Sequence, residues 1–238
     1  MAQLLEAALN GDRDHPATPR TPAQLAAEAR SAVEAGARAL HFHPYDGASE
    51  TLAAEHCAAA VRAVREACPG VPISLSTSAA IEADPERRHA LVAGWTELPE
   101  LVSANQGEEG IGALCELVMG RGVGVEAGLL SPADAEAFVE SGLGPRCAWA
   151  LIEPLAPDPA DALAEAAAME ATLSAAGIGL DQIHHGDGIA SWAVNRRAVA
   201  RGHGIRTGLE DTPVLPDGRA AAGNGELVAA AAALLAAR

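Results

Sequence analysis

The sequence contains no lysine, and all 16 of its basic side chains are arginines. A Schiff-base aldolase and an enzyme with a lysine-linked pyridoxal cofactor both need an ε-amine, so the composition excludes both classes. If the protein activates a carbonyl group, it must do so with a metal ion or with hydrogen-bond donors. The missing lysine therefore directs attention to residues that can hold a metal.

Long hydrophobic runs and a basic surface are also missing. No stretch of roughly 18 or more apolar residues occurs, so we expect no membrane span. The first residues lack the basic and then apolar regions of a secretory signal. The formal net charge of −16 argues against a nucleic-acid partner, because neutralising phosphates requires a basic face. A few arginines can still bind an anionic small molecule locally.

Cysteine is scarce, and its spacing is not that of a metal site. The four copies are Cys57, Cys68, Cys115 and Cys147. Three of them fall on predicted helices, where a small buried thiol is the ordinary interpretation. Free thiols fit a reducing compartment, so we expect a cytoplasmic protein.

Short apolar runs alternate with helical patterns from end to end of the chain. The predicted strands cover residues 4–10, 39–45, 71–77, 101–105, 123–129, 147–153, a run ending at 183–185, and 205–209. Helical patterns follow at 21–34, 49–68, 86–95, 109–121, from 131 onward, and at 161–176, 191–201 and 224–237. Eight such units predict an α/β fold, a (β/α)8 TIM barrel formed by one domain over residues 1–238. A doubly wound sheet is the alternative, but no Gly-x-Gly-x-x-Gly follows the first strand.

Two histidines close the second predicted strand. Side chains alternate along a strand, so His41 and His43 point to the same face. Catalytic residues of TIM barrels lie at the C-terminal ends of the strands. Two imidazoles at such a position supply most of a catalytic zinc site. We therefore expect zinc or another divalent metal.

Polar residues also end the other predicted strands. A purely structural barrel would need fewer of them, so their common position favours catalysis. An inward-facing Arg206 would be costly unless it met an anion, such as a substrate carboxylate. The residues alone leave the remaining metal ligand open among Glu126, Glu153, His184, His185, Glu210 and Asp211.

Four segments together resemble a known family. They are residues 10–13 (NGDR), 41–46 (HFHPYD), 202–211 (GHGIRTGLED) and 224–228 (NGELV). In this order they are similar to the β-keto acid cleavage enzymes, whose best-known member acts on 3-keto-5-aminohexanoate. The resemblance spans nearly the whole chain. It implies a (β/α)8 barrel, a divalent metal that is commonly zinc, and a homo-oligomer, either a tetramer or a dimer.

The resemblance also implies a reaction and a set of roles. A β-keto acid would react with acetyl-CoA, the co-substrate, to give acetoacetate and a new acyl-CoA. His41, His43 and Glu210 would hold the metal. Asp211 would remove a proton from C2 of the keto acid, and Arg206 would bind its carboxylate or developing charge. Catalytic or substrate-binding positions are also implied at Ser76, Thr77, Asn10, Arg13 and Asn105.

The seventh and eighth loops of a barrel are neighbours, which adds His184 and His185 as candidates for binding substrate or coenzyme. The aminohexanoate enzyme has an acidic residue, which reads a substrate amine, where this chain has Arg13. We therefore expect a neutral or anionic keto acid. Two other functions compete: a metal-dependent aldolase or retro-Claisen hydrolase that uses water, and a non-catalytic barrel that binds an acyl-CoA or a metal.

Overall fold

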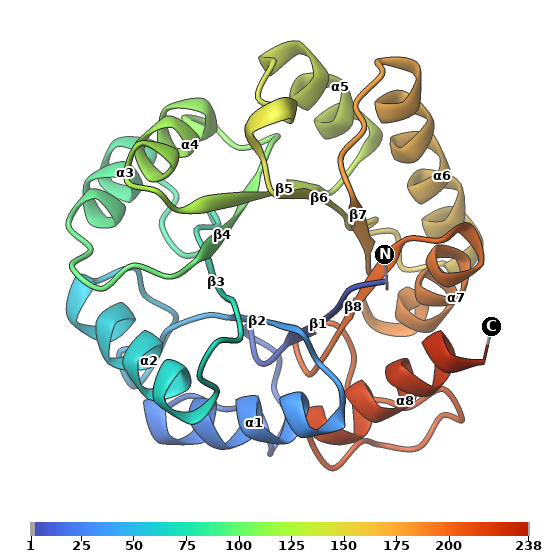
Figure 1. Ribbon diagram of the computed structural model, residues 1–238, viewed down its shortest axis with the longest axis horizontal. Helices are drawn as coiled ribbons and strands as arrows, with labels where there is room; N and C mark the ends of the chain where they lie inside the picture. Colours follow the sequence, from blue (N-terminus) through green and yellow to red (C-terminus); the bar gives the residue numbers. More distant parts are fainter. Residues whose placement is uncertain (1–2, 238) are drawn as a thin grey trace.

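The computed structural model describes residues 3–237 and shows a closed barrel of parallel strands surrounded by helices (Figure 1). The strands follow one another around the barrel in chain order, and β1 pairs with β8 to close it. The predicted (β/α)8 architecture is confirmed. No helix between residues 3 and 237 is long and apolar enough to cross a lipid bilayer.

The strands are short, and all except β4 and β5 end earlier than the sequence pattern suggests. They are β1 (Leu5–Ala8), β2 (Ala39–Phe42), β3 (Ile73–Ser76), β4 (Leu101–Asn105), β5 (Gly124–Leu129), β6 (Trp149–Ile152), β7 (Gln182–His184) and β8 (Gly204–Thr207). Asn10 and His43 thus lie just beyond their strands. This position places polar side chains where the carboxyl ends of the strands meet, which we call the mouth of the barrel.

Of the eight helices in residues 3–237, four begin with a side-chain cap, at Thr21, Asp84, Ser131 and Asp158. They are α1 (Pro22–Ala35), α2 (Ala54–Ala67), α3 (Pro85–Ala93), α4 (Ile111–Gly120), α5 (Pro132–Ser141), α6 (Pro159–Ala175), α7 (Ser191–Arg201) and α8 (Asn224–Ala236), with 3-10 turns η1 (Gly144–Arg146) and η2 (Gly188–Ala190). Thr21 and Gln24 form a capping box at α1. Helix α2 begins later than predicted because Tyr45 and Glu50 form an antiparallel bridge before it.

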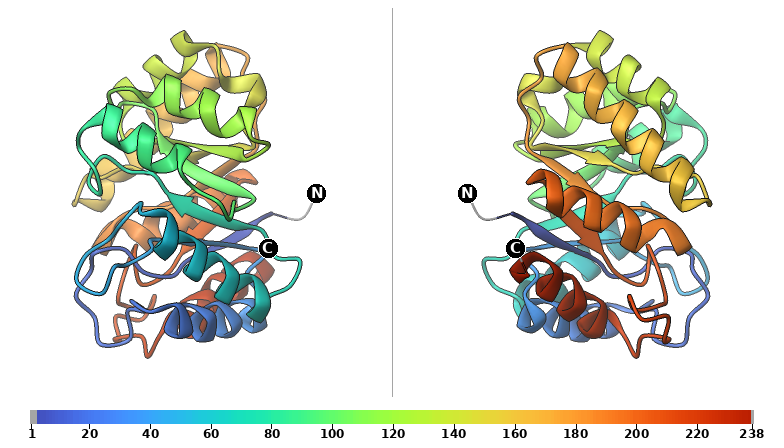
Figure 2. Two further views of the ribbon diagram at one scale, coloured as in Figure 1. Left: turned by 90° about the vertical axis from the view of Figure 1, so that its left-hand side faces the viewer. Right: turned by 90° about the vertical axis from the view of Figure 1, so that its right-hand side faces the viewer.

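The apolar core lies between the strands and the helices. Outward-facing side chains such as Leu40, Phe42 and Val125 are fully buried there. The alanine-rich helices need little space, and α1 packs beside both α2 and α8 (Figure 2). All four cysteines are free and buried, as expected for the three on predicted helices. The barrel interior is different, because charged side chains are buried in it beside apolar ones.

A carboxylate on α6 connects three elements at the outside of the barrel. Glu170 accepts hydrogen bonds from Arg197 at 2.6 Å, from Arg201 at 2.7 Å, and contacts His203 at 3.1 Å. Burial raises the pKa of Glu170, but the bonds from Arg201, His203 and Arg197 outweigh it and lower this pKa to about 2. The ionised carboxylate therefore stabilises the packing of α6 on α7 and on the start of β8.

We expect Glu170→Gln to lower the free energy of unfolding by about 1–2 kcal/mol at neutral pH, less than the full linkage value because Arg201 is half exposed. The pKa is depressed in the folded state, so this stabilisation is complete above the ordinary value of 4.5 and is lost as the pH falls towards about 2. Urea unfolding across this pH range measures it. Glu165→Gln, on the same helix, is the control, and equal pH profiles for both variants would contradict the prediction.

Candidate active site

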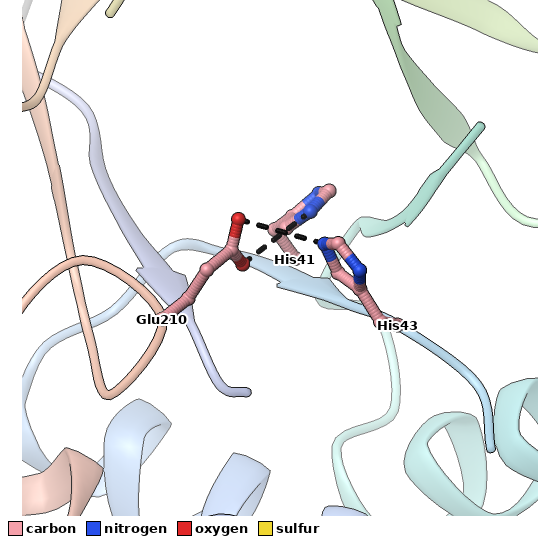
Figure 3. Close-up of side chains that lie close together, drawn as sticks. All are labelled: His41, His43 and Glu210. Carbon is pink, nitrogen blue, oxygen red and sulfur yellow. Dashed lines mark ion pairs between the residues drawn. The ribbon is translucent and has the colours of Figure 1, made fainter. Parts of the chain in front are cut away.

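Three of the predicted metal ligands converge at the mouth of the barrel. His41 lies on β2, His43 follows it, and Glu210 comes from the turn after β8 (Figure 3). The Nε2 atom of His41 is 3.6 Å from Glu210 Oε2, and Nε2 of His43 is 3.5 Å from Glu210 Oε1. The three possible ligand atoms lie within 4.8 Å of one another.

This donor set fits a divalent metal. Two imidazoles and one carboxylate are a common ligand set of catalytic zinc sites, which keep a further position open for water or substrate. The Oε2 atom of Glu210 is buried and has no hydrogen-bond partner among residues 3–237. An unpaired buried carboxylate oxygen is costly, and a cation between the three side chains would compensate it.

The two imidazoles have different protonation behaviour. Burial holds the pKa of His41 well below its ordinary value, so this ring is neutral and can donate a lone pair. Burial also lowers the pKa of His43, but the carboxylates of Glu210 and Glu50 outweigh it and raise this pKa to about 10. Glu50 contacts His43 Nδ1 at 2.9 Å through Oε1, and so fixes the second ring from behind.

Arg206 lies beside the three ligand residues, inside the barrel. Its Nη2 atom is 2.9 Å from Glu210 Oε1 and 3.0 Å from Asp211 Oδ1. Burial disfavours the charged guanidinium, but Asp211 and Glu210 outweigh this and keep the pKa of Arg206 well above its ordinary value. Burial would raise the pKa of Glu210, and Arg206 is the largest of the influences that hold it well below the ordinary value.

The adjacent histidines His184 and His185 have different surroundings. His185 joins the cluster: its Nδ1 is 3.2 Å from Asp211 Oδ1, and its Nε2 is 3.5 Å from Glu153 Oε2. His184 is not brought to the cluster. Its ring stacks on His203 with 4.6 Å between centroids, and its Nε2 lies 3.0 Å from Gln182 Oε1. Successive residues of a strand face opposite ways, so only one of the pair can face the site.

Asn10 holds the chain around the metal ligands. Its Oδ1 accepts from the backbone N–H of His43 at 2.8 Å, and its Nδ2 donates to the backbone oxygen of the same residue at 2.8 Å. Arg13 lies over the turn after β8, donating to the backbone oxygen of Glu210 at 3.1 Å and pairing with Asp187. Both residues thus contact the cluster through its backbone.

The remaining predicted residues lie at, or just beyond, the ends of β3 and β4. Thr77 Oγ1 donates to the Ser103 carbonyl at 2.7 Å, and Asn105 Nδ2 donates to Glu108 Oε1 at 2.9 Å. Ser76 is buried at the end of β3. The first bond ties the end of β3 to β4, and the second ties Asn105 to its own loop; the predicted substrate roles stay predictions.

The sequence did not point to three polar residues near the cluster. They are Glu50, which contacts His43, Ser74, which contacts His41, and Glu6, which is fully buried inside the barrel. Glu6 stands alone as a charge inside the apolar run of the first strand, which was a usable signal. Ser74 precedes Ser76 by two positions and therefore shares its face, which was a weaker one. Glu50 had no signal, because its contact with His43 depends on how the loop after β2 folds.

The chain is similar to known proteins over most of its length. A family model described as beta-keto acid cleavage enzyme matches residues 3–141 and 125–238. A ternary complex of ObcA with a C4-CoA adduct and oxalate is 18% identical, with a TM-score of 0.75 over 94% of this chain and 64% of that chain. A binary complex of ObcA with oxaloacetate is also 18% identical, with a TM-score of 0.73 over 94% of this chain and 64% of that chain. Tryptophan synthase subunit alpha from Legionella pneumophila str. Paris is 10% identical, with a TM-score of 0.62 over 99% of this chain and 94% of that chain.

At these identities the structural likeness shows the fold alone. The chain spans 62% to 64% of the length of the ObcA chains that it matches, which is less than two thirds. The family model, in contrast, covers nearly every residue.

We expect the wild-type protein to bind about one Zn²⁺ per chain and the double variant His41→Ala, His43→Ala to bind none, because two of the three donors are removed. Elemental analysis after loading with Zn²⁺ and desalting measures this. The matched control is His56→Ala, His89→Ala, which removes two histidines from α2 and α3. Unchanged stoichiometric zinc in the first double variant would contradict the metal site.

Proposed function

The chain belongs to the β-keto acid cleavage enzyme family, and on that basis we propose that it is a zinc-dependent acyltransferase that cleaves a carbon–carbon bond. A β-keto acid and acetyl-CoA would give acetoacetate and a new acyl-CoA. The observation that carries this proposal is the grouping of His41, His43 and Glu210 beside Asp211 and Arg206 at the mouth of the barrel.

The ObcA structures support the choice of substrates. Oxaloacetate, bound in one of them, is itself a β-keto acid, and another holds a C4-CoA adduct. The chain's composition is consistent with this chemistry, because no step needs a lysine. When bound, the metal would act as a Lewis acid that holds the carboxylate and ketone of the keto acid and favours enolate formation.

The surroundings of Asp211 support the proposal that it acts as the base. Its Oδ1 faces both His185, at 3.2 Å, and Arg206, at 3.0 Å. Its Oδ2 is buried and has no partner among the described residues, so this oxygen is available to accept a proton from C2. Arg206 holds the carboxylate in position and offers its positive charge to the carboxylate of the substrate.

The bond changes balance as follows. C2, once deprotonated, attacks the carbonyl of the acetyl thioester and displaces coenzyme A thiolate. The thiolate then attacks the ketone carbon C3, and the C2–C3 bond breaks. The electron pair leaves on C2, which takes the proton back from Asp211. The products are acetoacetate and the acyl-CoA of the remaining fragment, with no oxidant or reductant consumed.

We expect Asp211→Asn to lower kcat by about 10²- to 10⁴-fold, because the amide cannot accept the C2 proton. Zinc content should stay unchanged, since this residue is not one of the three ligands. Acetoacetate and acyl-CoA are measured with and without acetyl-CoA, which separates acyl transfer from hydrolysis by water. Asp217→Asn, an exposed aspartate in the loop before α8, is the control. A wild-type rate in Asp211→Asn with full metal would exclude it as the base.

The position of Arg13 predicts the tail of the substrate. Its guanidinium lies over the turn that carries Glu210 and Asp211, and 29% of its side chain is exposed. We expect kcat/KM for a keto acid with a carboxylate tail, such as 3-ketoadipate, to exceed that for 3-keto-5-aminohexanoate by at least about 10-fold, because a guanidinium pairs with an anion. Preference for the amine would overturn this expectation.

Two variants sharpen the comparison. Asp187 pairs with Arg13 and would compete with an anionic tail. Asp187→Asn should therefore strengthen the preference for the anionic acid, whereas Arg13→Glu should weaken or reverse it.

A further inference from the structure

Three buried side chains beneath the metal ligands take no part in the proposed chemistry. They are Glu6 on β1, Ser74 on β3 and Glu126 on β5, and each is 0% exposed. Interiors of such barrels are usually filled by branched apolar side chains. Burying two carboxyls and a hydroxyl costs free energy unless each finds a partner, so their partners are informative.

Ser74 connects His41 to Glu126. The serine Oγ lies 3.3 Å from His41 Nδ1, and its hydroxyl donates to Glu126 Oε2 at 2.5 Å. A hydroxyl has only one hydrogen to donate. Because that hydrogen goes to Glu126, the serine oxygen can only accept at His41, and Nδ1 must carry the ring proton. The Nε2 atom, which faces Glu210, is then left with its lone pair.

Glu6 completes the chain behind Glu126. Both carboxyl groups are fully buried inside the barrel and each influences the pKa of the other, so two ionised carboxylates would repel each other there and one of them holds a proton. Burial, and then the neighbouring Glu126, raise the pKa of Glu6 well above its ordinary value. Neither oxygen of Glu6 has a hydrogen-bond donor among the described residues. If Glu6 is protonated and donates its hydrogen to Glu126, it no longer lacks a hydrogen-bond partner.

The charged groups around the pair agree with one remaining negative charge. Arg206, His185 and Asp211 are the ionisable side chains whose charges act on the two carboxyls. Of these, Arg206 faces them from β8, the strand next to Glu6. Because Arg206 already pairs with Glu210 and Asp211, it cannot also compensate two ionised carboxylates at Glu6 and Glu126.

We propose that Glu6, Glu126 and Ser74 form a hydrogen-bonded chain that sets the tautomer of His41 and so prepares its Nε2 for the metal. The three are positioning residues, since they act through His41 and touch neither substrate nor metal. The inference rests on the metal site proposed above. Outer hydrogen bonds of this kind orient ligating histidines and contribute about 10- to 100-fold to metal affinity.

The first test needs no variant and no metal. In ¹⁵N-labelled, metal-free wild-type protein, the imidazole nitrogens of His41 report which atom is protonated. We expect Nδ1 to carry the proton, with Nε2 unprotonated. Predominant protonation at Nε2 would overturn the proposal. The signals are assigned by their loss in a His41→Ala sample.

The second test breaks the chain at two points. Ser74→Ala and Glu6→Leu should each weaken Zn²⁺ binding by roughly 10- to 100-fold and shift the His41 tautomer, whereas Glu6→Gln should do neither, because its amide still donates to Glu126. Thr207→Val, which removes another buried strand hydroxyl, is the control. Zn²⁺ affinity is measured by competition with a chromophoric chelator, and circular dichroism checks folding.

The outcomes separate the two proposals. Wild-type Zn²⁺ affinity and tautomer in folded Ser74→Ala and Glu6→Leu would overturn the hydrogen-bonded chain. Wild-type protein that binds Zn²⁺ with the expected tautomer but releases no acyl-CoA would contradict the proposed function and leave the chain intact.

Discussion

The buried guanidinium of Arg206 is the constraint on which the site depends. A cation inside a barrel is tolerated only if carboxylates surround it, and here Glu210, Asp211 and Glu153 approach Nη2 at 2.9, 3.0 and 3.9 Å. The same contacts keep Glu210 ionised, and they hold Asp211 in place. One cation thus positions both the proposed metal ligand and the proposed base. A change at Arg206 would therefore affect metal binding and proton transfer together.

That single cation does not balance the acids around it. Glu6 and Glu126 are fully buried near Arg206, and the partly buried Glu153 places Oε1 3.9 Å from its Nη2, in addition to the closer Glu210 and Asp211. Burial raises the pKa of Glu153, and Glu6 is neutral in the proposed hydrogen-bonded chain. The uncompensated negative charge that remains lies at Glu210, beside which His43 holds a proton in the metal-free protein. A divalent cation at this point would replace the proton and supply the missing positive charge, which supports the proposed metal site.

The periodicities of the sequence were enough to predict the fold and the common face of the two histidines, whereas the roles of the other site residues were suggested by the family resemblance. Alternation of eight apolar runs with helices specifies the barrel, and the two-residue spacing of His41 and His43 puts both on one face whatever the rest of the chain does. Prediction was weaker where a role depends on tertiary contacts. Asn10 binds the backbone around His43, and His184 faces outward, because loop geometry and strand register decide these points and neither leaves a mark in the local pattern.

The spacing Arg-x-Gly-x-Glu-Asp has a steric reason. A β-carbon at Gly208 would lie 1.8 Å from the backbone oxygen of Ala8, so only glycine lets the end of β8 cross against β1. The chain then turns, and Glu210 and Asp211 return to the guanidinium of Arg206, which is four and five residues earlier. Gly11, at φ +98°, approaches the same turn from β1, where a β-carbon would lie 2.8 Å from Glu210 Cγ. The two glycines thus allow one short segment to supply the residues proposed to bind the substrate anion, to hold the metal and to act as the base.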